Sequence, residues 1–154
     1  MNILRRTMLK AAGSAGAMAA TAAAGFGGGR AWAANRNEAA FQAKAVADAL
    51  KGLGATSLVE SRDIVITAPD IAENGAVVPV AVTSRIANTE NIAILAEKNP
   101  FPLAASFDIM PGADAYVSVR LKVGQTTDMR AVVKAGGKYF TAVKEVKVTV
   151  GGCG

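Results

Sequence analysis

A succession of short β-branched segments, each closed by a turn signal, most constrains what this chain can fold into. The segments follow Ala55 and are separated by residue pairs that favour turns, among them Asn74-Gly75, Pro111-Gly112 and Gly136-Gly137. Apolar and polar residues alternate within 116–123, as is typical of a strand with one buried and one exposed face. The pattern indicates a β-rich fold for most of the chain.

The spacing of the segments predicts about seven strands. They cover residues 63–67, 76–86, 91–97, 103–110, 116–123, 129–134 and 138–150. Because no helices alternate with them, we predict an all-β, immunoglobulin-like antiparallel β-sandwich rather than a βαβ fold. A partly open barrel gives a similar pattern and is the alternative. Pro79 is expected to place its strand at a sheet edge or on a bulge, and Gly136-Gly137 is expected to form a hairpin.

One helix is expected before the strands, over residues 38–53. Its apolar side chains recur four residues apart, at Phe41, Ala45, Ala49 and Leu53. Asn37 is the expected N-cap, and Gly52 or Gly54 the expected stop. A single apolar stripe predicts a helix that packs against a sheet or a partner.

The N-terminal residues resemble an export signal rather than part of the fold. Arg5-Arg6 precedes a long Ala- and Gly-rich tract, and Ala31-Trp32-Ala33 offers a cleavage site. The arginine pair followed by Leu9-Lys10 is similar to a twin-arginine (Tat) signal, although Met8 stands where Phe is commonest. A membrane-anchoring helix is the alternative, but the tract has little Leu, Ile or Val to stabilise it in lipid.

These observations divide the chain into three parts. We expect a cleaved twin-arginine-type signal peptide at 1–33, a β-sandwich domain at 34–150 and a flexible C-terminal tail at 151–154. The whole chain carries 17 basic and 12 acidic residues, a net +5, but four of the basic residues lie in the leader. The remaining 13 minus 12 gives +1, too little for a nucleic-acid partner. After signal cleavage we expect a periplasmic protein without membrane attachment.

Residue types exclude most catalytic chemistries. The chain has no histidine and one cysteine, which removes Ser-His and Cys-His pairs and most zinc and copper sites. Asp108 and Asp114 are expected to be loop acids, and Met110 and Met129 to be packing residues within strands. Tyr116, Tyr139 and Phe140 are expected in the core or an interface. The chain is therefore predicted to be neither an enzyme nor a cofactor-binding protein.

The candidate site is the C-terminal tail. Cys153, the only thiol, stands between Gly151-Gly152 and Gly154 directly after a valine-rich strand. Glycine gives a slim, adaptable segment, and an unperturbed thiol pKa of about 8.5 leaves little thiolate at neutral pH. We infer a carrier thiol that a visiting enzyme activates. The alternatives are an intermolecular disulfide through Cys153 and a tail without a role.

The tail Val146-Lys147-Val148-Thr149-Val150-Gly151-Gly152-Cys153-Gly154 resembles the C-terminus of SoxY, the sulfur compound carrier family of bacterial thiosulfate oxidation. The resemblance extends through 74–80 and 111–122. It implies an immunoglobulin-like sandwich and Cys153 as the covalent attachment site, with Gly151, Gly152 and Gly154 as the flexible arm. One departure is visible, because the family usually has two glycines after the cysteine.

The resemblance also implies partners. These are SoxZ in a heterodimer, and transiently the haem enzyme SoxXA, the hydrolase SoxB and, in some systems, SoxCD. In the family, SoxXA couples thiosulfate oxidatively to the cysteine and SoxB releases the terminal sulfone as sulfate. The competing hypothesis is a structural or adhesive sandwich that self-dimerises through a Cys153 disulfide. A metal-delivery role is disfavoured by the lack of histidine.

Overall fold

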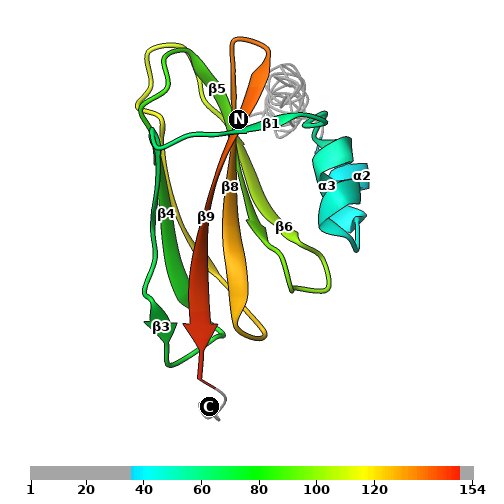
Figure 1. Cartoon of the computed structure of the whole chain (residues 1–154), viewed down its shortest axis with the longest axis vertical. Helices are drawn as coiled ribbons and strands as arrows, with labels where there is room; N and C mark the ends of the chain where they lie inside the picture. Colours follow the sequence, from blue (N-terminus) through cyan, green and yellow to red (C-terminus); the bar gives the residue numbers. More distant parts are fainter. Residues whose placement is uncertain (1–35, 150–154) are drawn as a thin grey trace, which may run out of the picture. The chain divides into compact units, whose positions relative to one another are not determined.

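Two β-sheets packed face to face form the body of the protein in the computed structural model, which describes residues 36–149 (Figure 1). The six-stranded sheet has the order β1-β9-β8-β5-β6, with β3 also paired to β9. Its strands are β1 (Leu58–Glu60), β3 (Ile71–Ala72), β5 (Thr89–Ala96), β6 (Leu103–Asp108), β8 (Thr127–Ala135) and β9 (Lys138–Val148). The three-stranded sheet has the order β2-β4-β7, formed by β2 (Ile64–Thr67), β4 (Val78–Ser84) and β7 (Tyr116–Leu121). The predicted all-β sandwich is confirmed.

The sandwich closes over side chains that alternate inward along both sheets. In β4, for example, Val78, Val80 and Val82 are buried while Pro79 faces solvent. They meet the inward side chains of the other sheet, which include Ile92, Ile94, Met129, Val133 and Val146. The period of two that the sequence shows in these segments is therefore the period of burial.

The β8–β9 hairpin forms as predicted. Ala135 pairs with Lys138, so Gly136 and Gly137 are the two residues of the loop. Their φ angles are +55° and +74°, the left-handed region that a two-residue type I′ turn requires at both positions. Glycine occupies this region without a Cβ penalty, which explains the pair.

Two short strands depart from the predicted antiparallel pattern. β1 and β3 were not among the seven segments expected, and both pair with β9 in parallel. β1 pairs with the first residues of β9, where Val59 faces Phe140, and β3 pairs with its last residues, where Ala72 faces Val148. The remaining ladders are antiparallel.

Pro79 lies in the middle strand of its sheet, so the prediction of an edge strand is wrong for β4 as a whole. Pro79 is opposite Arg120 of β7. On the other side, β2 pairs only with residues 81–84 of β4. Because β2 stops short of Pro79, the missing N–H costs no ladder hydrogen bond on that side.

The single predicted helix is two helices, α2 (Glu38–Gln42) and α3 (Val46–Gly52). Ala43 and Ala45 have extended backbone (ψ 135° and 145°), which breaks the stripe. The break lets the helices fold against each other, because a Cβ on Gly52 would lie 2.8 Å from the Cα of Ala40. The Asn37 side chain caps α2 by accepting from Ala40 N–H at 3.1 Å, as predicted, and donates to Gly52 O at 2.7 Å.

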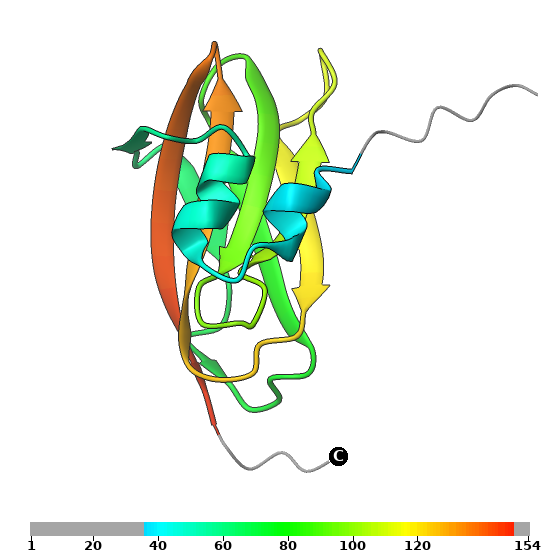
Figure 2. The same ribbon diagram turned by 90° about the vertical axis from the view of Figure 1, so that its right-hand side faces the viewer.

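The helix pair covers part of the outer face of the six-stranded sheet (Figure 2). Ala40 and Ala49 are fully buried there against Leu95, Leu103 and Val132. Tyr139 of β9 fastens the pair, because its hydroxyl donates to Leu53 O at 2.9 Å. The expected packing of a helix on a sheet is confirmed. None of the helices between residues 36 and 149 has the length and apolar character needed to cross a bilayer.

Candidate functional site

The predicted site residues Cys153, Gly151, Gly152 and Gly154 lie outside the described residues. The structure describes the strand that leads to them, β9, and the next residue, Thr149. Figure 1 shows that β9 ends beside β3, at the opposite end of the sandwich from the β8–β9 turn. We call the end of β9 together with Thr149 the root of the tail. The contacts of this root are the part of the site that the structure describes.

Backbone hydrogen bonds hold this root on one side. Lys147 N–H donates to Asp70 O at 3.0 Å, and Thr149 N–H donates to Ala72 O at 3.1 Å. The bonded residues on β9 alternate, as a parallel ladder requires. Thr149 is thus held by the fold four residues before Cys153 in the sequence.

The other side of the root is held by a loop and by a close backbone approach. Val148 N–H donates to the Thr126 hydroxyl at 3.0 Å. A Cβ on Gly75 would lie 2.9 Å from Cγ1 of Val148 and 2.4 Å from the carbonyl oxygen of Val123, which leaves room only for glycine. Val123 N–H in turn donates to Gly75 O at 2.7 Å. We call this part of the structure the tail anchor. It consists of residues 70–77, 123, 126 and 146–149.

The Asn74-Gly75 pair therefore has a second role that its turn-forming character did not reveal. The Asn74 side chain accepts from Ala76 N–H at 2.8 Å, as expected for a turn residue. Gly75 is needed for contact with β9 rather than for a positive φ, since it is not among the residues with positive φ. Sequence reasoning missed β3 and Thr126 entirely, because no local pattern marks a two-residue strand that pairs with a segment about 75 residues away.

An ion pair connects Asp70 of the tail anchor to Lys144 of β9. The Lys144 ammonium lies 3.0 Å from Oδ1 of Asp70 and donates to Ala68 O at 2.7 Å. Lys144 is about one-third exposed and Asp70 is almost fully exposed, so solvent screens the pair. Both contacts of Lys144 connect β9 to the segment that leads into β3.

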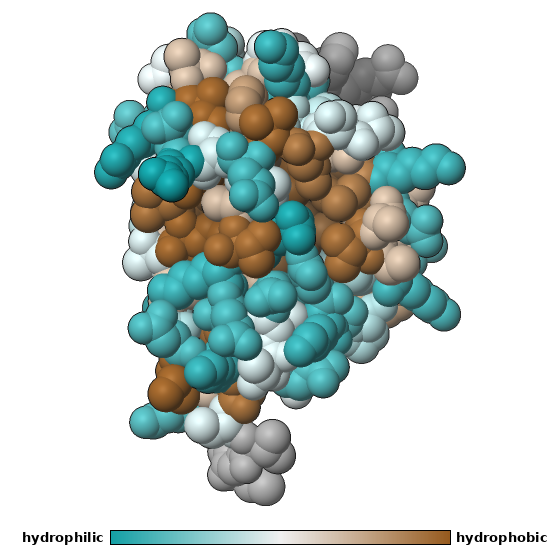
Figure 3. All heavy atoms as spheres, viewed as in Figure 1, coloured by the Kyte–Doolittle hydropathy of each residue, from teal (hydrophilic) through white to brown (hydrophobic). Residues whose placement is uncertain are grey.

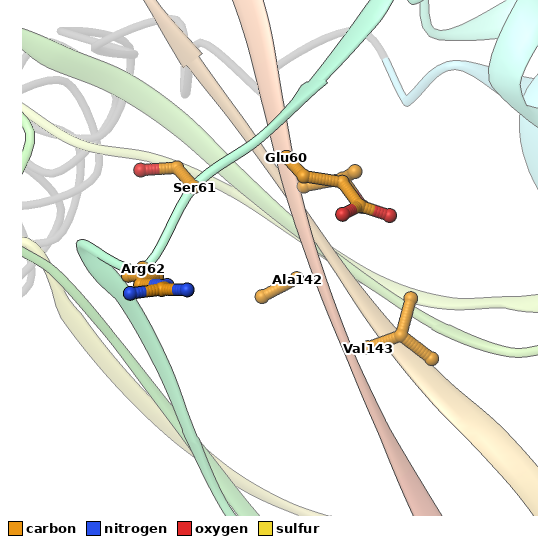
Figure 4. A pocket seen from close by; sticks show the side chains of 6 residues that line it. Glu60, Ser61, Arg62, Ala142 and Val143 are labelled. Atoms are coloured by element: carbon orange, nitrogen blue, oxygen red, sulfur yellow. The ribbon is translucent and has the colours of Figure 1, made fainter.

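A pocket of about 400 Å³ lies along the middle of β9, and Figure 4 shows the residues that line it. Glu60 is the last residue of β1, Ser61 and Arg62 come from the connection after it, and Thr141, Ala142 and Val143 belong to β9. Among the polar lining residues, Thr141 is bound within the fold, because its hydroxyl donates to Ala131 O at 3.0 Å and accepts from Arg130 at 3.4 Å. Arg130 itself pairs with Glu97 at 2.6 Å.

The pocket is also too far from the root to receive the tail thiol. Val143 precedes Thr149 by six strand residues, about 20 Å at about 3.3 Å per residue. The four residues from Thr149 to Cys153 span at most about 14 Å. Cys153 therefore cannot reach the Val143 end of this pocket.

The structure also shows where the methionine and aspartate side chains named in the sequence analysis lie. Met129 is fully buried in the core, as expected, whereas Met110 is 70% exposed, so its assignment as a packing residue within a strand is wrong. β6 ends at Asp108, two residues before it, because Pro111-Gly112 turns the chain there. The Asp108 carboxylate accepts from the Asn91 amide at 2.9 Å. Within residues 36–149, no three His, Cys, Asp or Glu side chains are grouped so that they could hold a metal ion.

Aromatic side chains divide between core and surface. Phe140 packs at the edge of the main core, and Tyr139 against the helix pair. Tyr116 is 55% exposed and is not a core residue. It stands at the start of β7, near the end of the sandwich where β9 begins.

Comparison with known proteins relates this architecture to one family. The family model of the sulfur oxidation protein SoxY matches residues 50–153, a range that includes Cys153. The chain is 44% identical to the sulfur carrier protein SoxY from Chlorobium limicola f thiosulfatophilum, with a TM-score of 0.60, covering 67% of this chain and 96% of that chain. No curated protein matches the chain.

Two further solved structures match with TM-scores below 0.5. A superoxide reductase (neelaredoxin) from Ignicoccus hospitalis matches at 22% identity and a TM-score of 0.49, over 56% of this chain and 79% of that chain. The human F-spondin reeler domain matches at 8% identity and a TM-score of 0.46, over 60% of this chain and 94% of that chain. Sequence identity this low says nothing about function. The SoxY family model, in contrast, covers well over half of the chain. The chain therefore belongs to the SoxY family of sulfur oxidation proteins.

Proposed function

We propose that this protein is a covalent sulfur carrier whose Cys153 thiol holds thiosulfate-derived intermediates for partner enzymes. One structural observation carries the proposal: the fold holds the chain firmly up to Thr149, four residues before its only cysteine. The 44% identity to a sulfur carrier protein supports the same role. The protein supplies an attachment point and no catalytic group of its own.

The loading step forms one sulfur–sulfur bond. The Cys153 thiol and thiosulfate join to give Cys–S–S–SO₃⁻, with loss of one proton and two electrons. A haem enzyme of the SoxXA type accepts the electrons. The chain has no histidine to serve as a base, so the proton passes to a base of the enzyme or to water.

The release step is a hydrolysis. Water attacks the terminal sulfone of Cys–S–S–SO₃⁻, and sulfate leaves with a proton while the persulfide Cys–S–SH stays on the carrier. A hydrolase of the SoxB type catalyses this step, and in systems with SoxCD the remaining sulfane sulfur is oxidised further. A carrier must pass between these enzymes, so a tail that extends from a fixed root suits the task.

We further propose that the working protein is periplasmic and forms a heterodimer with SoxZ. The Arg5-Arg6 leader would export the folded pair together, since SoxZ generally lacks its own signal. Replacing Arg5-Arg6 with a lysine pair should then leave both proteins in the cytoplasm. Export of SoxZ in cells without this carrier would contradict joint export.

The deciding experiment is intact-mass spectrometry of the native protein from thiosulfate-grown cells. We expect adducts of thiosulfonate and of additional sulfur atoms, located on Cys153 by fragmentation and removed by a reducing agent. A protein that always carries a bare thiol would refute covalent carriage. A uniform disulfide dimer, indifferent to the sulfur source, would support the structural or adhesive alternative instead.

A further inference from the structure

The short distance between Thr149 and Cys153 restricts where a processing enzyme can touch this protein. Four residues span at most about 14 Å, and the thiol must lie at the reactive centre of the enzyme during each step. An enzyme that encloses its centre in a channel uses most of this length inside the channel. Its rim must then meet the surface around Thr149. The argument rests on the proposed function, because it needs Cys153 to be the attachment site.

Two large aliphatic side chains are exposed on the tail anchor. Ile71 is 58% exposed and Val77 is 52% exposed. Ile71 lies beside the root, because it is the partner of Lys147 in the β3–β9 ladder. Val77 follows the turn that packs Gly75 against Val148, and its N–H donates to Asn74 O at 3.4 Å.

The surface around the root is otherwise polar. Figure 3 shows brown, hydrophobic atoms beside the lower end of β9, in the region of β3, among hydrophilic residues. Exposed charges of both signs accompany them, including Glu73 and Lys147. Mixed charges give little net attraction to one partner, so apolar contact is the main source of binding free energy that this surface offers.

Single exposed aliphatic residues are ordinary on soluble proteins. Ile71 and Val77 differ from the others in position, because the reach of the tail requires contact at the root. Their backbone is also fixed in advance by the anchor hydrogen bonds, which lowers the entropy lost on docking. We propose that Ile71 and Val77 form a docking collar for the apolar rim of the channel through which a sulfur-processing enzyme admits the tail.

The test compares collar variants as substrates of purified SoxB. Tetrathionate loads the carrier chemically, because the Cys153 thiol displaces thiosulfate and a proton and retains the S–SO₃⁻ group. Sulfate release is then measured for wild type, Ile71→Ser, Val77→Ser and the double variant. Ile71→Leu and Val77→Leu keep the surface apolar, and Met110→Ser is the matched control at the opposite end of the sandwich, where Met110 is 70% exposed. A synthetic peptide of residues 146–154, loaded in the same way, reports docking by the tail alone.

We expect the double serine variant to raise KM roughly tenfold with kcat unchanged, since it removes contact area and not chemistry. The leucine variants and Met110→Ser should keep the wild-type KM, and the peptide should have a higher KM than the carrier. Equal melting temperatures and equal thiol reactivity toward a small disulfide reagent exclude unfolding as the cause. If the double serine variant, or the peptide, has the KM of wild type, the collar is refuted while carriage on Cys153 stands. If wild-type carrier cannot be loaded or processed at all, the proposed function itself fails.

Discussion

The N–H of Thr149 donates a hydrogen bond to the carbonyl oxygen of Ala72 at 3.1 Å, although 77 residues separate the two in the chain. This bond is the last of a series that holds the end of β9 to β3. Within residues 36–149 it is the backbone hydrogen bond that lies closest in sequence to Cys153. The number of residues between this bond and Cys153 therefore depends on where β3 pairs with β9.

Removal of the thiol should abolish carriage without weakening the fold. Cys153→Ser or Cys153→Ala is expected to eliminate sulfur adducts in the mass spectrum and thiosulfate-dependent electron transfer in a reconstituted system. The free energy of unfolding should change by less than about 0.5 kcal/mol, because the core is built from residues between 40 and 146. Full electron transfer with either variant would contradict covalent attachment.

Substitution of Gly75 should loosen the tail anchor. Gly75→Ala places a Cβ 2.4 Å from Val123 O and 2.9 Å from Val148 Cγ1, so backbone must shift. We expect a loss of roughly 1–3 kcal/mol in urea unfolding, and faster hydrogen exchange at the Lys147 and Thr149 amides. Gly124→Ala is the control, because a Cβ there meets nothing within 4 Å. Equal effects of the two substitutions would show that close packing at Gly75 is unimportant.

The β8–β9 turn should accept asparagine and reject valine. Gly136 has a φ of +55°, which Asn adopts more readily than other residues and which a β-branched side chain disfavours. Gly136→Asn is expected to leave thermal stability nearly unchanged, whereas Gly136→Val should lower it by about 1–2 kcal/mol. Neither substitution should affect sulfur loading, because this turn lies at the far end of β9 from the root.

The pKa of the Glu90 carboxyl should lie below its ordinary value and depend on Lys134. The Lys134 ammonium donates to this carboxylate at 2.9 Å, and the Gly136 and Gly137 N–H groups add smaller effects of the same sign. A lowered folded-state pKa means that the stabilisation is present above the ordinary pKa of Glu and is lost as the pH falls through the folded value. Both side chains are well exposed, so the change in global stability is small.

Lys134→Met should therefore raise the pKa of Glu90 toward its ordinary value, which an NMR titration of the side-chain carboxyl measures directly. Lys122→Met, near the tail-anchor end of the sandwich, is the matched control and should leave the titration of Glu90 unchanged. An identical Glu90 titration in wild type and Lys134→Met would rule out the ion pair in solution.

Local patterns predicted the elements that depend on local physics. The alternation of residues 116–123 and 138–150 predicts strands because successive side chains must face opposite sides. Strands formed at Tyr116–Leu121 and Lys138–Val148. Gly136-Gly137 predicts a hairpin because few residues tolerate two positive φ values in succession. The Asn37 cap is equally local, since its acceptor and donor are three residues apart.

The features that local patterns missed depend on contacts between distant residues. The helix stripe from Phe41 to Leu53 is continuous in sequence, but packing of Gly52 on Ala40 favours two helices over one. β3 has only two residues and exists because β9 offers it a ladder. Gly75 was recognised as a turn residue, although its tightest constraint comes from Val123 and Val148.

The sequence by itself determined that one thiol is available, that glycines flank it and that it follows a valine-rich strand. The presence of a thiol and the period of side-chain alternation depend only on residues that are neighbours in the chain. These conclusions therefore required no knowledge of the tertiary structure. Only the tertiary structure decided where β9 is tied to β3 and which exposed side chains, Ile71 and Val77, belong to the tail anchor. Those features arise from pairing between segments about 75 residues apart, and such pairing is selected by the burial and hydrogen bonding of the whole fold rather than by any single segment.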